Sequence, residues 1–176
     1  MATLKEQIMR YTPAALALAL LAGVTSSIGQ SATPTPLDPR AAALLQQGRT
    51  ALAAGNVDGA IDAYESALAV QPGHVAILLN LAEATRKQGM QGKALHYYRE
   101  ALKIDPANQY AIAGEGAALV EKGAVEKARR NLARLQQLCG GDCPASVELA
   151  AAIQKGPAPQ VVTADQVKPQ PVVSQN

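Results

Sequence analysis

Residues 55–72, GNVDGAIDAYESALAVQP, and residues 89–106, GMQGKALHYYREALKIDP, decide the fold of this chain because the second stretch repeats the pattern of the first. Each stretch opens with glycine and closes with proline, and alanine and tyrosine recur at matching places between them. A third stretch, residues 123–140 (GAVEKARRNLARLQQLCG), keeps the glycine and the first alanine but has Leu132 in place of the tyrosine. Self-similarity at a fixed period, here about 34 residues, is typical of a stack of repeats.

The same period extends to residues on either side of these stretches. Six columns keep this spacing: Gly55, Gly89 and Gly123; Ala60, Ala94 and Ala128; Pro72 and Pro106; Tyr64, Tyr98 and Leu132; Leu44, Leu78 and Ile112; Gly48, Ala82 and Gly116. So many columns in one phase indicate a repeat protein rather than a chance coincidence.

Each period predicts two helices with a turn between them. In the first period, Asp38 followed by proline is a typical helix start, and an apolar stripe at helical spacing follows it. Gly55 provides the left-handed stop, Asn56 or Asp58 starts a second helix, and Pro72 ends the pair. Three periods therefore predict three helix pairs.

Residues 41–142 resemble three consecutive tetratricopeptide repeats, at 41–74, 75–108 and 109–142. The columns that carry the resemblance are small residue, Gly, Ala, aromatic, Ala and Pro, filled by Gly48, Gly55, Ala60, Tyr64, Ala67 and Pro72, and then by Ala82, Gly89, Ala94, Tyr98, Ala101 and Pro106. The third repeat keeps Gly116, Gly123 and Ala128, but departs at Leu132, Leu135 and Gly140.

The resemblance implies an all-α, right-handed superhelical solenoid whose first helices line a concave groove. A terminal repeat needs a closing helix for solubility, and residues 144–155 (PASVELAAAIQK) are the candidate. We expect Val147, Leu149, Ala150 and Ile153 to form its inward stripe. The repeat domain is then expected to span residues 38–155.

Composition supports a helical protein and excludes several functional classes. The 176 residues include 36 Ala and five Tyr but no Phe and no Trp. Alanine is the strongest helix former, whereas β-sandwiches, β-barrels and stacking surfaces for single-stranded nucleic acid depend on aromatic and β-branched residues. The net charge is only +2, so electrostatics favour no nucleic-acid partner.

The two ends of the chain are expected to lie outside the repeat fold. Lys5 and Arg10 precede an eleven-residue apolar run at 14–24, too short to span a bilayer, which needs about 20 residues. Residues 1–29 are therefore predicted to be a cleaved signal peptide, with an uncleaved membrane anchor as the alternative. Residues 30–37 are expected to form a Pro-rich spacer and residues 156–176 a disordered tail.

A signal peptide predicts export to the periplasm or the medium, assuming a bacterial source, with no stable membrane span after cleavage. In that compartment Cys139 and Cys143, which flank Gly-Gly-Asp, are expected to form a disulfide. Closing so small a loop stabilises the fold by roughly 2 kcal/mol. Free thiols, redox chemistry and metal binding are the alternatives, although only His74 and His96 could contribute imidazole.

Neither catalytic machinery nor a cofactor is expected. The sequence contains no GxSxG, HExxH or phosphate-binding glycine loop. The basic cluster Lys127, Arg129, Arg130 and Arg134 is interpreted as a solvated helix face rather than an anion-binding patch. The chain is therefore predicted not to be an enzyme.

Repeat phase predicts which residues line the concave groove. They are Leu45, Arg49, Leu52, Leu79, Asn80, Glu83, Arg86, Lys87, Tyr110, Ala113, Ala117, Val120 and Glu121. Such a surface suits a protein or peptide partner with a hydrophobic anchor and at least one acidic group.

Chaperone-docking members of the tetratricopeptide repeat family grip a terminal carboxylate with five side chains. Only Asn80 matches that set; Leu45, Arg49, Tyr110 and Gly114 occupy its other positions. The clamp is therefore predicted to be absent. The function predicted is an exported scaffold or adaptor for cell-envelope assembly or processing. The alternatives are a self-associating structural protein and an envelope thiol-redox helper using the two cysteines.

Overall fold

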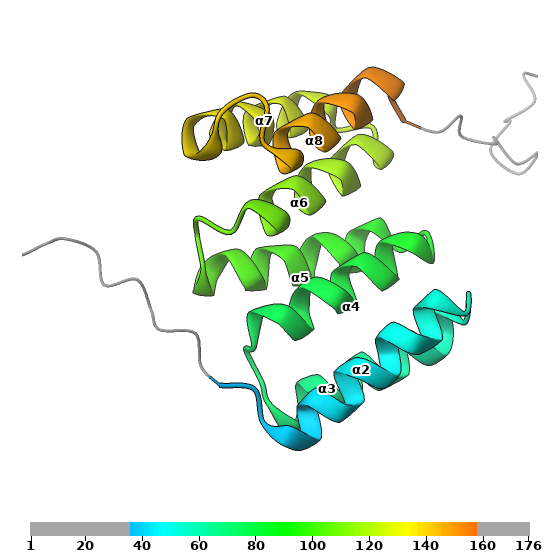
Figure 1. Cartoon of the computed structure of the whole chain (residues 1–176). Coiled ribbons are helices and arrows are strands. Elements are labelled where there is room, and N and C mark those ends of the chain that lie inside the picture. The colour runs from blue at the N-terminus through cyan, green and yellow to red at the C-terminus, as the bar shows by residue number, and fades with distance from the viewer. Residues whose placement is uncertain (1–35, 158–176) are drawn as a thin grey trace, which may run out of the picture. The chain divides into compact units, whose positions relative to one another are not determined.

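The structure is a computed structural model that describes residues 36–157. Over that range it is entirely helical, and the order along the chain is α2 (Pro39–Ala53), α3 (Val57–Val70), α4 (Val75–Lys87), α5 (Gln91–Ile104), α6 (Gln109–Glu121), α7 (Val125–Cys139) and α8 (Pro144–Lys155) (Figure 1). The expected all-α fold, with three helix pairs and a further C-terminal helix, is confirmed.

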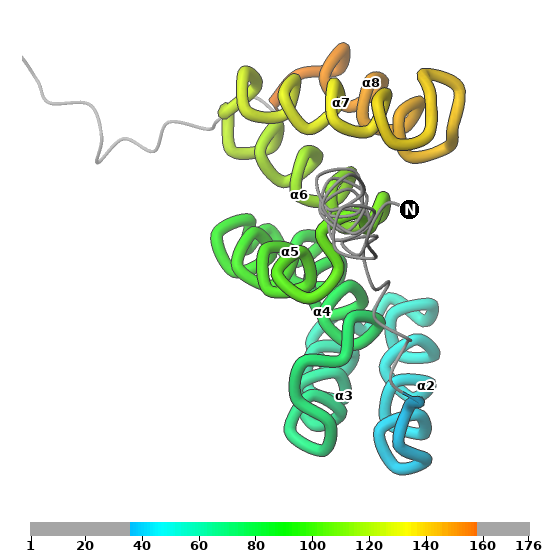
Figure 2. The backbone as a smooth tube through the Cα atoms, turned by 90° about the vertical axis from the view of Figure 1, so that its left-hand side faces the viewer, coloured from blue at the N-terminus to red at the C-terminus, as the bar shows by residue number. Residues whose placement is uncertain are grey.

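The helices stack as a superhelical array of antiparallel pairs. α2 packs on α3, α4 on α5 and α6 on α7, and each second helix also contacts the first helix of the next pair. The first helices α2, α4, α6 and α8 follow one another along one face, and α3, α5 and α7 lie behind them (Figures 1 and 2). One face of the array is therefore built from first helices alone.

Local sequence explains where the helices begin and end. The Asp38 carboxylate accepts hydrogen bonds from the backbone N–H groups of Arg40 and Ala41, and Asn56 caps α3 by accepting from Gly59 at 2.9 Å. α2, α4 and α6 end before glycines with φ of 78°, 85° and 81° at Gly55, Gly89 and Gly123. Residues with a Cβ rarely adopt this left-handed conformation, so the glycine column marks the turn inside each repeat.

Close helix approach explains the alanine and tyrosine columns. Ala60, Ala94 and Ala128 are completely buried. The Tyr64 ring lies against Gly48, where an added Cβ would come within 2.3 Å of Tyr64 Cε1. Small residues thus let paired helices approach and leave a space that tyrosine fills.

α8 buries only part of the stripe that the sequence predicted for it, because Leu149 is buried as expected but Val147 is not. Its buried residues are Ala145, Ser146 and Leu149, whereas Val147 is 53% exposed and Ile153 is half-buried. Ala150 is half-buried as well. The correction has a simple cause, because Leu149 is the residue that packs onto Gly116 of α6 and therefore sets the rotation of α8. Val147, two residues earlier, points away from the core.

Other predictions fall on parts of the chain that the structure does not describe. The predicted signal peptide at 1–29, the spacer up to residue 35 and the tail from residue 158 lie outside the described residues. Among the helices between residues 36 and 157, none is both long enough and apolar enough to cross a membrane.

Candidate functional site: the concave face of the first helices

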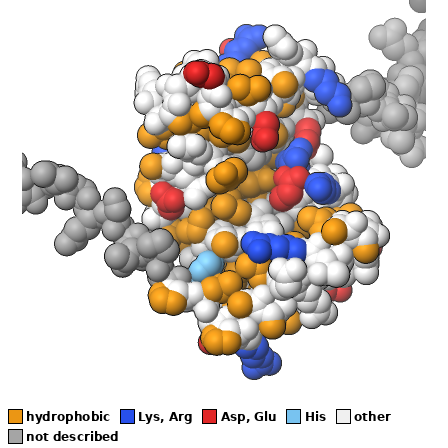
Figure 3. Space-filling model, viewed as in Figure 1, with side chains coloured by type: hydrophobic (Ala, Val, Ile, Leu, Met, Phe, Trp, Pro, Cys, Tyr) orange, Lys and Arg blue, Asp and Glu red, His pale blue; other side chains and the backbone are white. Residues whose placement is uncertain are grey.

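The face formed by the first helices carries most of the predicted groove residues. Figure 3 shows apolar side chains across the middle of this face and a group of acidic and basic side chains at one side. The predicted residues that are exposed or half-buried are Arg49, Leu52, Leu79, Asn80, Glu83, Arg86, Lys87, Tyr110, Ala113, Ala117 and Glu121.

Two predicted groove residues are not on the surface. Leu45 is 3% exposed and packs with Ala60 and Tyr64 in the core of the first repeat. Val120 is 2% exposed and belongs to the core cluster that α8 covers with Leu149. Both positions were predicted from repeat phase alone, and neighbouring side chains bury each of them. Leu45 and Val120 are therefore removed from the candidate site.

A charged cluster joins α4 to α6 across the boundary between the second and third repeats. The Arg86 guanidinium donates to both carboxylate oxygens of Glu83, from Nε at 3.0 Å and from Nη2 at 2.9 Å. Its Nη1 donates to Glu121 on α6. The Arg86 side chain is only 23% exposed, so this ion pair is partly shielded from water.

The surroundings of Arg86 keep its charge fixed. Burial opposes the charged guanidinium, but the hydrogen bond to Glu83 and the charges of Glu83 and Glu121 outweigh it and raise the pKa of Arg86. With two carboxylates bound, Arg86 is mainly a link between helices. It is not an unoccupied receptor for an acidic ligand group.

Tyr98 extends this cluster into the core. Its hydroxyl donates to Glu83 Oε2 at 3.1 Å, and burial followed by the charge of Glu83 raises the pKa of the Tyr98 phenol. The ring edge passes Gly114 of α6, where an added Cβ would lie 2.3 Å from Tyr98 Cε1. Gly114 therefore provides the gap through which the phenol reaches the polar cluster.

Two other cations on this face are more accessible than Arg86. Arg49 is exposed, and its Nε donates to Asn80 Oδ1 at a long 3.4 Å. The Lys87 ammonium lies 3.9 Å from Glu83, and its side chain is 50% exposed. Within residues 36–157 no ion pair involves Arg49. An acidic group approaching the α2–α4 half of the face would meet these two side chains first.

Around Tyr110, the α6–α8 half of the face is apolar. Tyr110, at the start of α6, is 74% exposed, and the half-buried Ala113 and Ala117 follow it along the helix. Val147 of α8 occupies the position of Ala113 one repeat period later and therefore continues the same line of positions. The sequence analysis missed Val147 as a surface residue, although extending the period by one more repeat would have placed it there.

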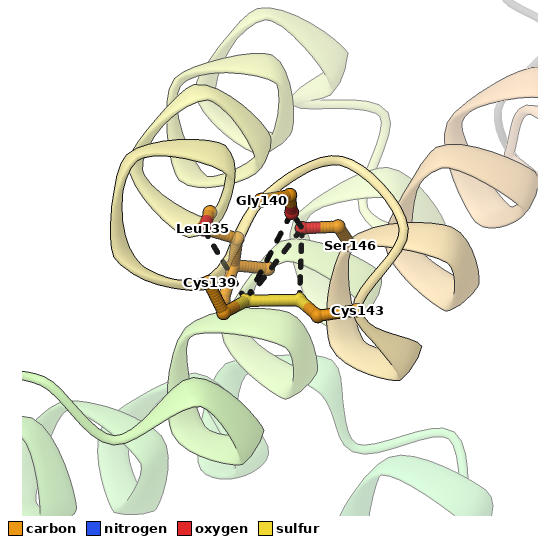
Figure 4. Close-up of a disulfide and its surroundings, with 5 residues drawn as sticks. All are labelled: Leu135, Cys139, Gly140, Cys143 and Ser146. Atoms are coloured by element: carbon orange, nitrogen blue, oxygen red, sulfur yellow. Dashed lines mark hydrogen bonds between the residues drawn. A yellow bond between two sulfur atoms is a disulfide. The ribbon is translucent and has the colours of Figure 1, made fainter.

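Cys139 and Cys143 form a disulfide between the end of α7 and the start of α8, with their Cα atoms 5.9 Å apart (Figure 4). The buried Ser146 hydroxyl donates to the Gly140 carbonyl at 2.9 Å, and Cys143 Sγ lies 3.3 Å from the same hydroxyl. The disulfide therefore ties together the two ends of the loop that leads into α8. In the described part of the chain, no group of three or more His, Cys, Asp or Glu side chains could hold a metal ion.

Comparison with known proteins gives the same architecture. A family model described as tetratricopeptide repeat matches residues 45–109. The TPR domain of Sgt2 from Aspergillus fumigatus has a TM-score of 0.61 at 25% identity, covering 77% of this chain and 95% of that one. The first TPR of Spaghetti (RPAP3), solved with the HSP90 peptide SRMEEVD, has a TM-score of 0.60 at 23% identity, covering 66% and 92%.

One curated relative is much longer than this chain, so the match covers only a small part of it. The CTR9 homolog of Arabidopsis thaliana is 31% identical over 104 residues, which is 58% of this chain. The chain spans only 10% of that relative. The described helices therefore have the superhelical fold of tetratricopeptide repeat domains, and residues 45–109 also match the family model.

Proposed function

We propose that this chain is a scaffold or adaptor that binds a protein partner through the concave face of α2, α4, α6 and α8. The observation that carries the proposal is the exposed Tyr110, which stands beside small residues on a face that also carries two accessible cations. Peptide binding by the similar RPAP3 domain supports the same use of this architecture.

The face favours a partner segment with two chemically different ends. An apolar side chain would pack between Tyr110 and Val147 over the small residues of α6, while an acidic group would face Arg49 and Lys87. This arrangement differs from a five-residue carboxylate clamp, of which the chain has only Asn80. The proposed ligand is therefore not defined by a terminal carboxylate.

Export to the cell envelope is a further part of the proposal. It is supported by the charged start and the apolar run at 14–24. A fusion of residues 1–35 to alkaline phosphatase, which is active only after export, tests it. Activity in a bacterial host supports export, and an inactive fusion retained in the cytoplasm contradicts it.

Site-specific crosslinking tests groove binding directly. A photoreactive amino acid at position 110 is expected to capture a partner in cells, because this side chain is exposed and its replacement disturbs no buried contact. The same amino acid at Ala133, an exposed residue of α7, is the matched control. Capture of the same protein from both positions would contradict the proposal.

Charge reversal then identifies the polar part of the groove. Arg49→Glu is expected to weaken capture of the partner at least tenfold, whereas Arg129→Glu on the outer face of α7 leaves it unchanged. Arg86 is avoided because its substitution would also break the link between α4 and α6. Equal binding by the Arg49 and Arg129 variants would contradict the role assigned to Arg49.

A further inference from the structure

α8 is in register with the first helix of a fourth repeat. Ala145 follows Ala111 by one repeat period and is buried like it. The end of the helix differs from α6, because Gly156, with a φ of 73°, is itself the C-cap of α8, as Gly140 is for α7, whereas Gly123 follows the C-cap Lys122. The chain beyond Gly156 does not repeat the second-helix pattern, since a proline, Pro169, takes the place of the buried leucine of α7.

Within residues 36–157 no second helix follows α8, so one face of α8 is open in this part of the chain. In the second repeat the small residue Ala82 of α4 is completely buried and packs in one cluster with Ala94 and Tyr98 of α5. The equivalent small residue of α8, Ala150, is only half-buried. No described helix stands against it in the place that α3, α5 and α7 take in the earlier repeats.

An apolar side chain adjoins this open position. Ile153 is half-buried, although Leu119, its equivalent in α6, is 5% exposed. The face thus retains the small and branched residues of a helix–helix contact without the second helix. The contact between a first and a second helix is made three times in residues 36–157, by α2 and α3, by α4 and α5 and by α6 and α7. For α8, no described second helix completes it (Figure 2).

We propose that the open face of α8 binds an amphipathic helix of a partner protein, which takes the place of the second helix of a fourth repeat. Continuity with the α4–α5 contact defines that helix. It has a small residue opposite Ala150, a large apolar residue or tyrosine four positions later and a second small residue three positions after that. Ala94, Tyr98 and Ala101 of α5 show this pattern. This surface is separate from the concave face proposed above.

The chain itself provides a suitable probe. A fluorescent peptide of residues 89–106 contains α5, which packs against an alanine at the position of Ala150. Anisotropy is expected to rise saturably when the full chain is added. Ala150→Arg is expected to weaken binding at least tenfold, because the long side chain blocks the helix. Ala133→Arg on the outer face of α7 and Tyr110→Asp on the concave face are expected to leave binding unchanged.

A grafted helix tests the same contact without depending on the affinity of a short peptide. Residues 157–176 are replaced by a copy of residues 89–107, so that α5 follows α8 in the phase in which it follows α4. Thermal unfolding is expected at a temperature several degrees above that of the same graft with aspartate in place of the Ala94 and Tyr98 equivalents. Equal unfolding temperatures would overturn the proposal.

The other outcomes are equally decisive. Peptide binding that survives Ala150→Arg would assign the contact to another surface and overturn the proposal. Binding that occurs only after removal of residues 158–176 would show that the chain covers this face itself, which also overturns a partner helix. Sedimentation that shows dimers lost with Ala150→Arg would replace the partner by a second copy.

Discussion

Tyr64 and Tyr98 occupy the same column of two consecutive repeats, yet the glycines beside their rings lie in different places. The Tyr64 ring lies against Gly48 of its own repeat, whereas the Tyr98 ring lies against Gly114 of the next one. The neighbouring residues differ between the two repeats. The residue equivalent to Gly48 in the second repeat is Ala82, which shares a core cluster with Tyr98. The glycine beside the Tyr98 ring is instead Gly114 of the third repeat.

The polar ends of the two tyrosines differ as well. Tyr98 donates its hydroxyl to Glu83, but the residue equivalent to Glu83 in the first repeat is Arg49, which has no acceptor. The buried Tyr64 hydroxyl accordingly has no hydrogen-bond partner among the described residues. One tyrosine column therefore contributes a polar connection to the groove in one repeat and only packing in the other.

The largest expected effect comes from adding a side chain at the two glycines that lie against the tyrosine rings. Gly48→Ala and Gly114→Ala each place a methyl group 2.3 Å from a tyrosine ring, so each is expected to lower the free energy of unfolding by about 2–3 kcal/mol. Gly92→Ala is the matched control, since nothing lies within 4 Å of the added Cβ. Chemical denaturation measures all three. A loss at Gly92 equal to that at Gly48 would mean that ring packing is not the cause.

The next largest effect is expected at the boundary between the second and third repeats, where Arg86 lies, compared with the boundary between the first and second, where Arg49 lies. Arg86→Met leaves Glu83 and Glu121 without their shared cation and is expected to cost about 2 kcal/mol, less than a fully buried pair because the cluster is partly exposed. Arg49→Met, at the preceding boundary, is expected to cost less than about 0.5 kcal/mol. Urea unfolding at low and high salt measures both. Equal losses would show that the two boundaries do not differ.

The smallest effect concerns the two hydroxyl groups. Tyr98→Phe removes a hydrogen bond to a carboxylate and is expected to destabilise the fold by about 1 kcal/mol. Tyr64→Phe removes a buried hydroxyl that lacks a partner among the described residues, so stability is expected to stay unchanged or rise by up to about 1 kcal/mol. Thermal unfolding of the pair measures the difference. A larger loss for Tyr64→Phe would contradict the assignment of partners.

The sequence predicted the site less completely than the fold. Repeat phase placed Arg49, Lys87 and Tyr110 on the concave face, where they are exposed. It also placed Leu45 and Val120 there, although both are buried. For the last helix it predicted that Val147 faces the core, whereas Val147 is exposed. The position of a residue within the repeat predicts its exposure only if every helix has the same rotation in the stack. Burial depends instead on which neighbouring side chain sets the rotation of each helix, as the leucine of α8 over the glycine of α6 shows.

The sequence alone determined the repeat length, the number of helices in the described part and those helix ends that a capping side chain or a glycine marks. Those features depend on local chemistry: a capping side chain such as that of Asp38, a left-handed glycine such as Gly55 and the spacing of small residues. Only the tertiary structure decided that Arg86 also binds Glu121 of the next repeat, that the Tyr98 ring lies against Gly114 and that α8 has an open face. These features depend on distances between helices far apart in the chain, which no local pattern specifies.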